Sequence, residues 1–231
     1  MTKILFISGF NTHPDDSNGV DLYLVFKIYY MFSGHELEFF RYDNGEPLNN
    51  VYCRLKAILD TKVHDLILTH SMGSCLFLRY VFEHGDKRNA ILCMPFIHAT
   101  PFNKLICALP LMSNCRLPKC LVLPNHLLLE GGNPLNDEIR LINLSQPICA
   151  INHFFLSDEN LVKTIGEYTN LRIIYSEDEQ ISPISEDILR VLGSKVLYIP
   201  GKHVAFGNAI QMNEFFEAFT EANTELLKKP R

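Results

Sequence analysis

The sequence lacks the features that mark nucleic-acid-binding, zinc-binding and membrane-spanning proteins. Its basic residues are scattered and the formal net charge is -5, whereas phosphate binding calls for clustered positive charge. No C-x-x-C zinc spacing occurs, and no uninterrupted apolar run approaches the roughly 20 residues needed to cross a bilayer. We therefore expect no nucleic-acid partner, no bound metal and no transmembrane segment.

Signals for export are also missing. The first residues, MTKILFISGF, contain one lysine and a short apolar run but no small-residue cleavage site, so they predict a first strand rather than a signal peptide. The seven cysteines are odd in number and mostly lie in apolar segments. This usage is typical of buried free thiols in a reducing compartment, and we expect a cytoplasmic location.

The amino-acid composition is that of a folded globular protein. With 231 residues, 47% hydrophobic and 20% charged, the chain is long enough for a single domain over residues 1–231. Apolar strand-like runs alternate with helix-like segments, which predicts an α/β protein: a three-layer α/β/α sandwich around a mostly parallel, twisted sheet. The expected strands cover residues 4–10, 36–42, 66–69, 90–97, 172–175 and 195–199. The expected helices cover residues 20–32, 51–59, 75–82, 186–192 and 208–227.

The interval at about 98–169 departs from this alternation. Its prolines (Pro101, Pro110, Pro118, Pro124, Pro134 and Pro147) separate bulky aliphatic residues, as in CLVLPNHLLLEGG. Repeated prolines prevent long helices, yet the aliphatic side chains need to be buried. We expect a compact insertion or cap at the sheet edge, whose leucines either receive an apolar substrate group or merely pack against the sheet.

The stretch LILTHSMGS runs an apolar strand directly into Ser71. The pentapeptide from Thr69 to Gly73 follows the G-x-S-x-G pattern of a nucleophile elbow, in which a strained turn projects the serine hydroxyl above the sheet. Gly73 provides the small neighbour that this turn requires, whereas Thr69 places a β-branched side chain where glycine is usual. The alternative is that Ser71 simply caps the helix that follows.

A nucleophilic serine needs a general base, and the base needs a group that orients it. The segment LRIIYSEDEQISP offers Asp178 in an acidic turn after a strand, and KVLYIPGKHVAFGN offers His203 before the last helix. The order serine, acid, histidine fits this architecture. Glu177 and Glu179 compete with Asp178 for the acid; Asp178 is preferred, and Glu179 fits some spacings almost as well.

With these motifs the chain resembles the α/β-hydrolase superfamily, in its branch of small serine esterases, lipases and thioesterases. The resemblance runs from the first strand to the last helix and leaves out the insertion. It implies Ser71 as the nucleophile, His203 as the general base and Asp178 as the acid, without a metal or organic cofactor. It also implies an oxyanion hole from the backbone N–H groups of Met72 and Phe10, the latter in ISGFNTH, where serine replaces the histidine of the usual His-Gly-x stretch.

The expected function is a serine hydrolase that cleaves a carboxylic ester or thioester of a small molecule through an acyl-enzyme. A peptidase or an acyltransferase would use the same site. A catalytically inactive hydrolase-fold binding module is a further alternative, which Thr69 and the missing His-Gly pair keep open. His70 is expected to pack away from the nucleophile, and His98 fits no metal-ligand spacing.

Overall fold

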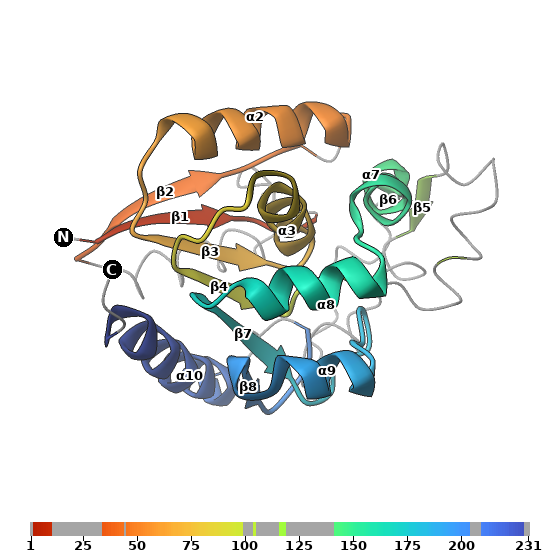
Figure 1. Cartoon of the computed structure of the whole chain (residues 1–231). Coiled ribbons are helices and arrows are strands. Elements are labelled where there is room, and N and C mark those ends of the chain that lie inside the picture. The colour runs from red at the N-terminus through yellow and green to blue at the C-terminus, as the bar shows by residue number, and fades with distance from the viewer. Residues whose placement is uncertain are drawn as a thin grey trace.

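A computed structural model of the chain describes residues 2–10, 34–43, 45–98, 104, 116–118, 141–203 and 209–228 (Figure 1). The helix expected at residues 20–32 lies outside these residues, as does most of the expected insertion. The described part contains the strands and loops that carry every predicted site residue.

Six parallel strands form the central sheet, in the order β2-β1-β3-β4-β7-β8. They are β1 (Lys3–Ile7), β2 (Glu36–Phe40), β3 (Leu66–His70), β4 (Ala90–Cys93), β7 (Leu171–Ser176) and β8 (Val196–Ile199). Every residue of the inner strands β3 and β7 is buried, as expected for parallel strands covered on both faces. The predicted fold class is confirmed.

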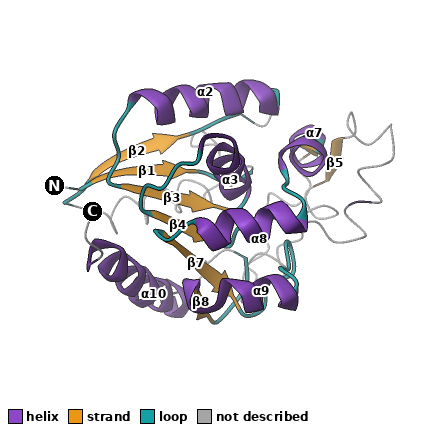
Figure 2. Ribbon diagram, in the orientation of Figure 1, coloured by secondary structure: helices purple, strands orange, loops and turns teal. Residues whose placement is uncertain are grey.

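The described helices cover both faces of this sheet (Figure 2). The helices that pack on it are α2 (Leu48–Thr61), α3 (Met72–His84), α8 (Asp158–Glu167), α9 (Glu186–Leu192) and α10 (Ala209–Lys228). Two apolar clusters follow from the alternation of strand side chains. Leu5 and Ile7 face the cluster shared with α2, α3, α8 and α9, whereas Ile4 and Phe6 face the cluster shared with α10.

The strand after α3 is shorter than the expected 90–97. β4 ends at Cys93, because Met94 has a positive φ of 41° and therefore leaves the extended conformation. Pro95 follows and has no N–H group to donate to a neighbouring strand. The segment Phe96–His98 then crosses the carboxyl edge of the sheet as a loop, next to the turn after β3.

Only parts of the expected insertion are described. β5 (Arg116–Pro118) pairs with β6 (Leu141–Asn143) in a separate antiparallel sheet, and α7 (Ser145–Cys149) leads into a π-helical turn, Ala150–Phe154. These elements lie beyond the carboxyl ends of the parallel strands, at the right in Figure 1. The later helix α8 packs on the main sheet through Leu161 and Ile165. A cap over the site stays a prediction.

Candidate active site

The turn between β3 and α3 has the backbone of a nucleophile elbow. Ser71 has φ 49° and ψ -120°, and its side chain makes no capping hydrogen bond to α3. The Ser71 N–H donates to the carbonyl of Cys93 (3.1 Å), and its carbonyl accepts from the Phe96 N–H (3.0 Å). A non-glycine residue at positive φ costs on the order of 1–3 kcal/mol. Ser71 therefore stands at the N-cap position of α3 without capping the helix through its side chain, as the alternative would require.

Two glycines allow the end of β1 to approach this elbow. A Cβ on Gly73 would lie 2.5 Å from the carbonyl oxygen of Ile7 and 2.6 Å from that of Ser8. A Cβ on Gly9 would lie 2.9 Å from the Cβ of Ser71. No side chain fits at either position without moving backbone, so both loops depend on glycine for their packing.

Thr69, the departure from the usual pattern, is accommodated by a hydrogen bond. Its side chain is fully buried and its Oγ1 lies 2.6 Å from Oγ of Ser74, in the first turn of α3. Both residues are small enough to meet across the elbow, and each satisfies the other's hydroxyl. A threonine at this position is therefore compatible with the strained turn.

His203 joins the serine to a buried carboxylate. The Ser71 hydroxyl donates to Nε2 of His203 over 2.9 Å, and Nδ1–H of His203 donates to Oε2 of Glu179 over 2.7 Å. The His203 and Glu179 side chains are 4% and 1% exposed. Serine, imidazole and carboxylate thus form one line of hydrogen bonds from a strained turn into the protein, which is the geometry of an activated nucleophile.

The carboxylate that bonds to His203 in this line is that of Glu179, and not that of the preferred Asp178. Asp178 is exposed, and its backbone N–H donates to the carbonyl of Gly201 (3.1 Å). Glu179 is instead buried, because the turn after β7 folds back and Oε1 of Glu179 accepts N–H groups from Ile181 (2.7 Å) and Ser182 (3.0 Å). Sequence spacing could not resolve which carboxylate this turn buries.

The electrostatics of Glu179 favour its ionised form. Burial raises the pKa of this carboxyl, but the charge and hydrogen bond of His203 and the two backbone donors outweigh burial and bring the pKa below its ordinary value. An ionised carboxylate holds the proton of the imidazole on Nδ1. Nε2 is thereby left as an acceptor for the Ser71 hydroxyl.

The two predicted oxyanion donors occupy suitable backbone positions. Met72 is the first residue of α3, where helix N–H groups have no intrahelical partner and the helix dipole is positive. Phe10 follows Gly9 in the turn after β1. The preceding Ser8 is held by Tyr42, whose hydroxyl donates to its carbonyl (3.1 Å). The joint role of the two donors stays a prediction.

His70 is a buried neighbour of this line. Its ring centroid is 5.6 Å from that of His203, and within the described residues neither of its ring nitrogens has a hydrogen-bond partner. Burial, followed by the nearby His203, lowers the pKa of His70 to about 3. His70 therefore stays neutral near pH 7.

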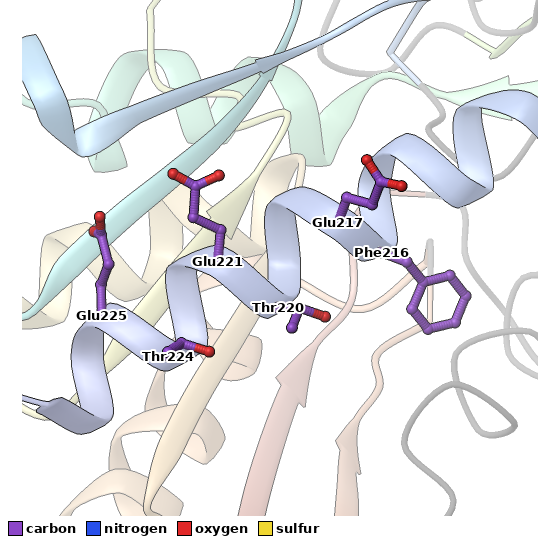
Figure 3. Close-up of a pocket in the computed structure, with 6 residues that line it drawn as sticks. All are labelled: Phe216, Glu217, Thr220, Glu221, Thr224 and Glu225. Carbon is purple, nitrogen blue, oxygen red and sulfur yellow. The ribbon is translucent and has the colours of Figure 1, made fainter.

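A surface hollow runs along α10 and does not include the line of Ser71, His203 and Glu179 (Figure 3). It is lined by Phe216, Glu217, Thr220, Glu221, Thr224 and Glu225. Within the ranges that the structure describes, no cluster of three or more His, Cys, Asp or Glu residues could hold a metal ion. None of the described helices is long and apolar enough to cross a membrane.

No protein-family model and no curated relative matches the sequence. Solved structures do match. The monoacylglycerol lipase of Paleococcus ferrophilus superposes with a TM-score of 0.65 at 14% identity, over 96% of this chain and 94% of that one. Est1E of Butyrivibrio proteoclasticus superposes with a TM-score of 0.55 at 14% identity, over 98% of this chain and 88% of that one. The ydeN gene product of B. subtilis superposes with a TM-score of 0.55 at 15% identity, over 99% of this chain and 100% of that one. The chain therefore has the α/β-hydrolase fold.

Proposed function

We propose that the protein is a serine hydrolase that cleaves a carboxylic ester through an acyl-enzyme, with Ser71 as nucleophile, His203 as base and Glu179 as acid. The observation that carries this proposal is the unbroken line of hydrogen bonds from Ser71 through His203 to Glu179, built on a residue with a strained backbone. A serine that only ended a strand would need neither the strain nor the buried carboxylate bonded to His203.

In the acylation step, Nε2 of His203 accepts the Ser71 proton while Oγ attacks the ester carbonyl carbon. The carbonyl π electrons move onto oxygen, and the N–H groups of Met72 and Phe10 are the proposed donors to that oxyanion. Loss of one such donor typically costs about 10²–10³ in rate. The tetrahedral species then collapses, the bond from carbon to the alkoxy oxygen breaks, and His203 protonates that oxygen, which leaves as the alcohol.

Deacylation repeats these steps with water. His203 accepts a proton from water as the hydroxide adds to the acyl carbon, and it then returns the proton to Ser71 as that oxygen leaves. Throughout, the ionised Glu179 stabilises the imidazolium through the 2.7 Å bond to Nδ1. No redox step and no added electrophile is needed.

Two observations favour an ester with an apolar acyl group over a peptide. The solved structures with this fold include a monoacylglycerol lipase and a carboxyl esterase of Tuber melanosporum, which gives a TM-score of 0.55. Near the elbow, the ring of Phe96 packs edge-on against Phe155 with centroids 4.9 Å apart, and the Phe96 N–H bonds to Ser71. Because the Phe96 backbone bonds to Ser71, we propose that an acyl chain binds on this side of the serine.

The test is covalent labelling with a fluorophosphonate probe, followed by hydrolysis of p-nitrophenyl esters of graded acyl length. Wild-type protein should be labelled and hydrolyse the esters, whereas Ser71→Ala should do neither while keeping its circular dichroism spectrum. Folded wild-type protein that resists the probe would instead support the inactive binding module. A rate that rises with acyl length would support the apolar acyl group.

A further inference from the structure

Ser182 holds two parts of the site together from a fully buried position. Its backbone N–H donates to Oε1 of Glu179 over 3.0 Å. Its hydroxyl donates to the carbonyl of His98 over 3.0 Å. One residue therefore contacts the carboxylate on one side and the loop that leaves β4 on the other.

That loop leads back to the nucleophile. Two residues before His98, the N–H of Phe96 donates to the carbonyl of Ser71 over 3.0 Å. The route from Ser71 through Phe96 and His98 to Ser182 thus consists of two hydrogen bonds and a three-residue segment. It reaches the same carboxylate that His203 contacts.

The two routes make a closed ring. One runs from the Ser71 hydroxyl through His203 to Oε2 of Glu179, and the other runs from the Ser71 carbonyl to Oε1 through Ser182. The acid is therefore fixed to the nucleophile's own backbone as well as to the base. The second route ties the acid turn to the elbow independently of the histidine.

Further contacts secure the turn on either side of Ser182. Nδ1–H of His98 donates to the carbonyl of Pro183 over 3.1 Å. The N–H of Ile184 donates to the hydroxyl of Tyr175 over 2.9 Å. These bonds keep the turn folded, so removing the Ser182 hydroxyl alone should loosen the acid without unfolding the segment.

We infer that Ser182 is a positioning residue, whose hydroxyl fixes Glu179 relative to Ser71 by tying the acid turn to the loop after β4. This inference rests on the proposed function. Its physical basis is that an imidazole is oriented by its carboxylate partner, and small misplacements of a catalytic group cost rate rather than binding. The residue acts through Glu179 and need not touch substrate.

The test compares Ser182→Ala with the matched control Ser185→Ala. Ser185 is three residues along the chain, and its side chain caps α9 by accepting the N–H of Ile188. Both substitutions remove one hydroxyl and one hydrogen bond from the same segment. We expect kcat for p-nitrophenyl acetate and the rate of fluorophosphonate inactivation to fall about tenfold in Ser182→Ala, with KM nearly unchanged. Ser185→Ala should keep the wild-type kcat.

Two readouts separate positioning from a merely structural role. A loosened Glu179 stabilises the imidazolium less, so the acid limb of the kcat/KM profile should move to lower pH in Ser182→Ala. The NMR resonance of the His203 Nδ1 proton should also move upfield as its bond to Glu179 weakens. Ser182→Thr, which keeps the hydroxyl, should restore part of the rate if its extra methyl group is accommodated.

Equal kcat, pH profile and Nδ1 proton shift in folded Ser182→Ala and wild type would overturn the inference while leaving the proposed hydrolase intact. An equal loss of kcat in Ser182→Ala and Ser185→Ala would also overturn it, because the loss would then follow segment stability. Wild-type protein that the probe does not label would remove the proposed function itself.

Discussion

The two halves of the candidate site are held by different forces. On the side of β1 and β3, the elbow is fixed by backbone hydrogen bonds of Ser71 and by close packing, with Gly73 against the carbonyls of Ile7 and Ser8 and Gly9 against the Cβ of Ser71. On the side of β7 and β8, Glu179 and His203 are fixed by hydrogen bonds between side chains and the acid turn. An atom added to a closely packed site forces the backbone to move, whereas the loss of one hydrogen bond removes only part of a network.

The contrast also explains where the chain departs from the usual motif. Thr69 is tolerated because it faces another small side chain, Ser74, rather than backbone. Gly73 has no such freedom, because carbonyl oxygens lie within 2.6 Å of the Cβ that any other residue would add. In this elbow, the motif position that faces backbone carbonyls admits only glycine, whereas the position that faces a side chain admits threonine.

The largest effect is expected from Gly73→Ala, which tests the steric half. The added methyl group must displace the end of β1 or the start of α3, and overpacking of this kind costs about 3 kcal/mol. Because the same displacement moves the elbow, hydrolysis should be lost together with stability. Urea unfolding and p-nitrophenyl acetate hydrolysis measure the two effects.

Gly166→Ala in α8 is the control for this substitution. Its Cβ would meet nothing within 4 Å, and alanine is favoured over glycine in a helix by up to about 1 kcal/mol. This variant should be at least as stable as wild type and fully active. A stable, active Gly73→Ala would show that the elbow is not held by contact.

The next effect is expected from Glu179→Gln, which tests the hydrogen-bonded half. Oε1 is held by two backbone N–H donors, so the glutamine oxygen must take that place and its NH₂ group must face Nδ1 of His203. Nδ1 then has to accept, the imidazole proton moves to Nε2, and the base cannot take the Ser71 proton. A loss of about 10⁴ in kcat is expected, with the fold intact.

Asp178→Asn is the matched control, because it makes the same charge change on the adjacent, exposed residue. Its kcat should stay within about twofold of wild type, since surface charges contribute little. A large loss in Asp178→Asn with none in Glu179→Gln would return the role of the acid to Asp178. The comparison uses steady-state kinetics at one pH, on protein checked by circular dichroism.

The sequence predicts the sheet because its signal is local. Runs such as LILTH and LRIIYS are mainly apolar, and they become the fully buried strands β3 and β7. Ser71 and His203 could also be selected from the sequence, since Ser71 directly follows β3 and His203 lies in the loop after β8. In contrast, the choice among Glu177, Asp178 and Glu179 depends on how a turn folds back onto Ile181 and Ser182. The role of Ser182 needs a partner, His98, that is distant in sequence.

The smallest effect is expected in the pH dependence of the free energy of unfolding, and it again concerns the hydrogen-bonded half of the site. Because the pKa of Glu179 is lowered on folding from an ordinary value of 4.5, the stability it contributes is fully present above that value and is lost as pH falls through the folded-state pKa. Wild-type protein should therefore lose free energy of unfolding below about pH 4.5 more steeply than Glu179→Gln, which has no proton to bind at this site. Gly166→Ala should keep the wild-type slope, since it changes no titratable group. Urea unfolding between pH 3 and 7 gives the free energy of unfolding of the three proteins as a function of pH. If this free energy fell equally steeply at low pH in wild type and Glu179→Gln, hydrogen bonds to an ionised Glu179 would not stabilise this half of the site.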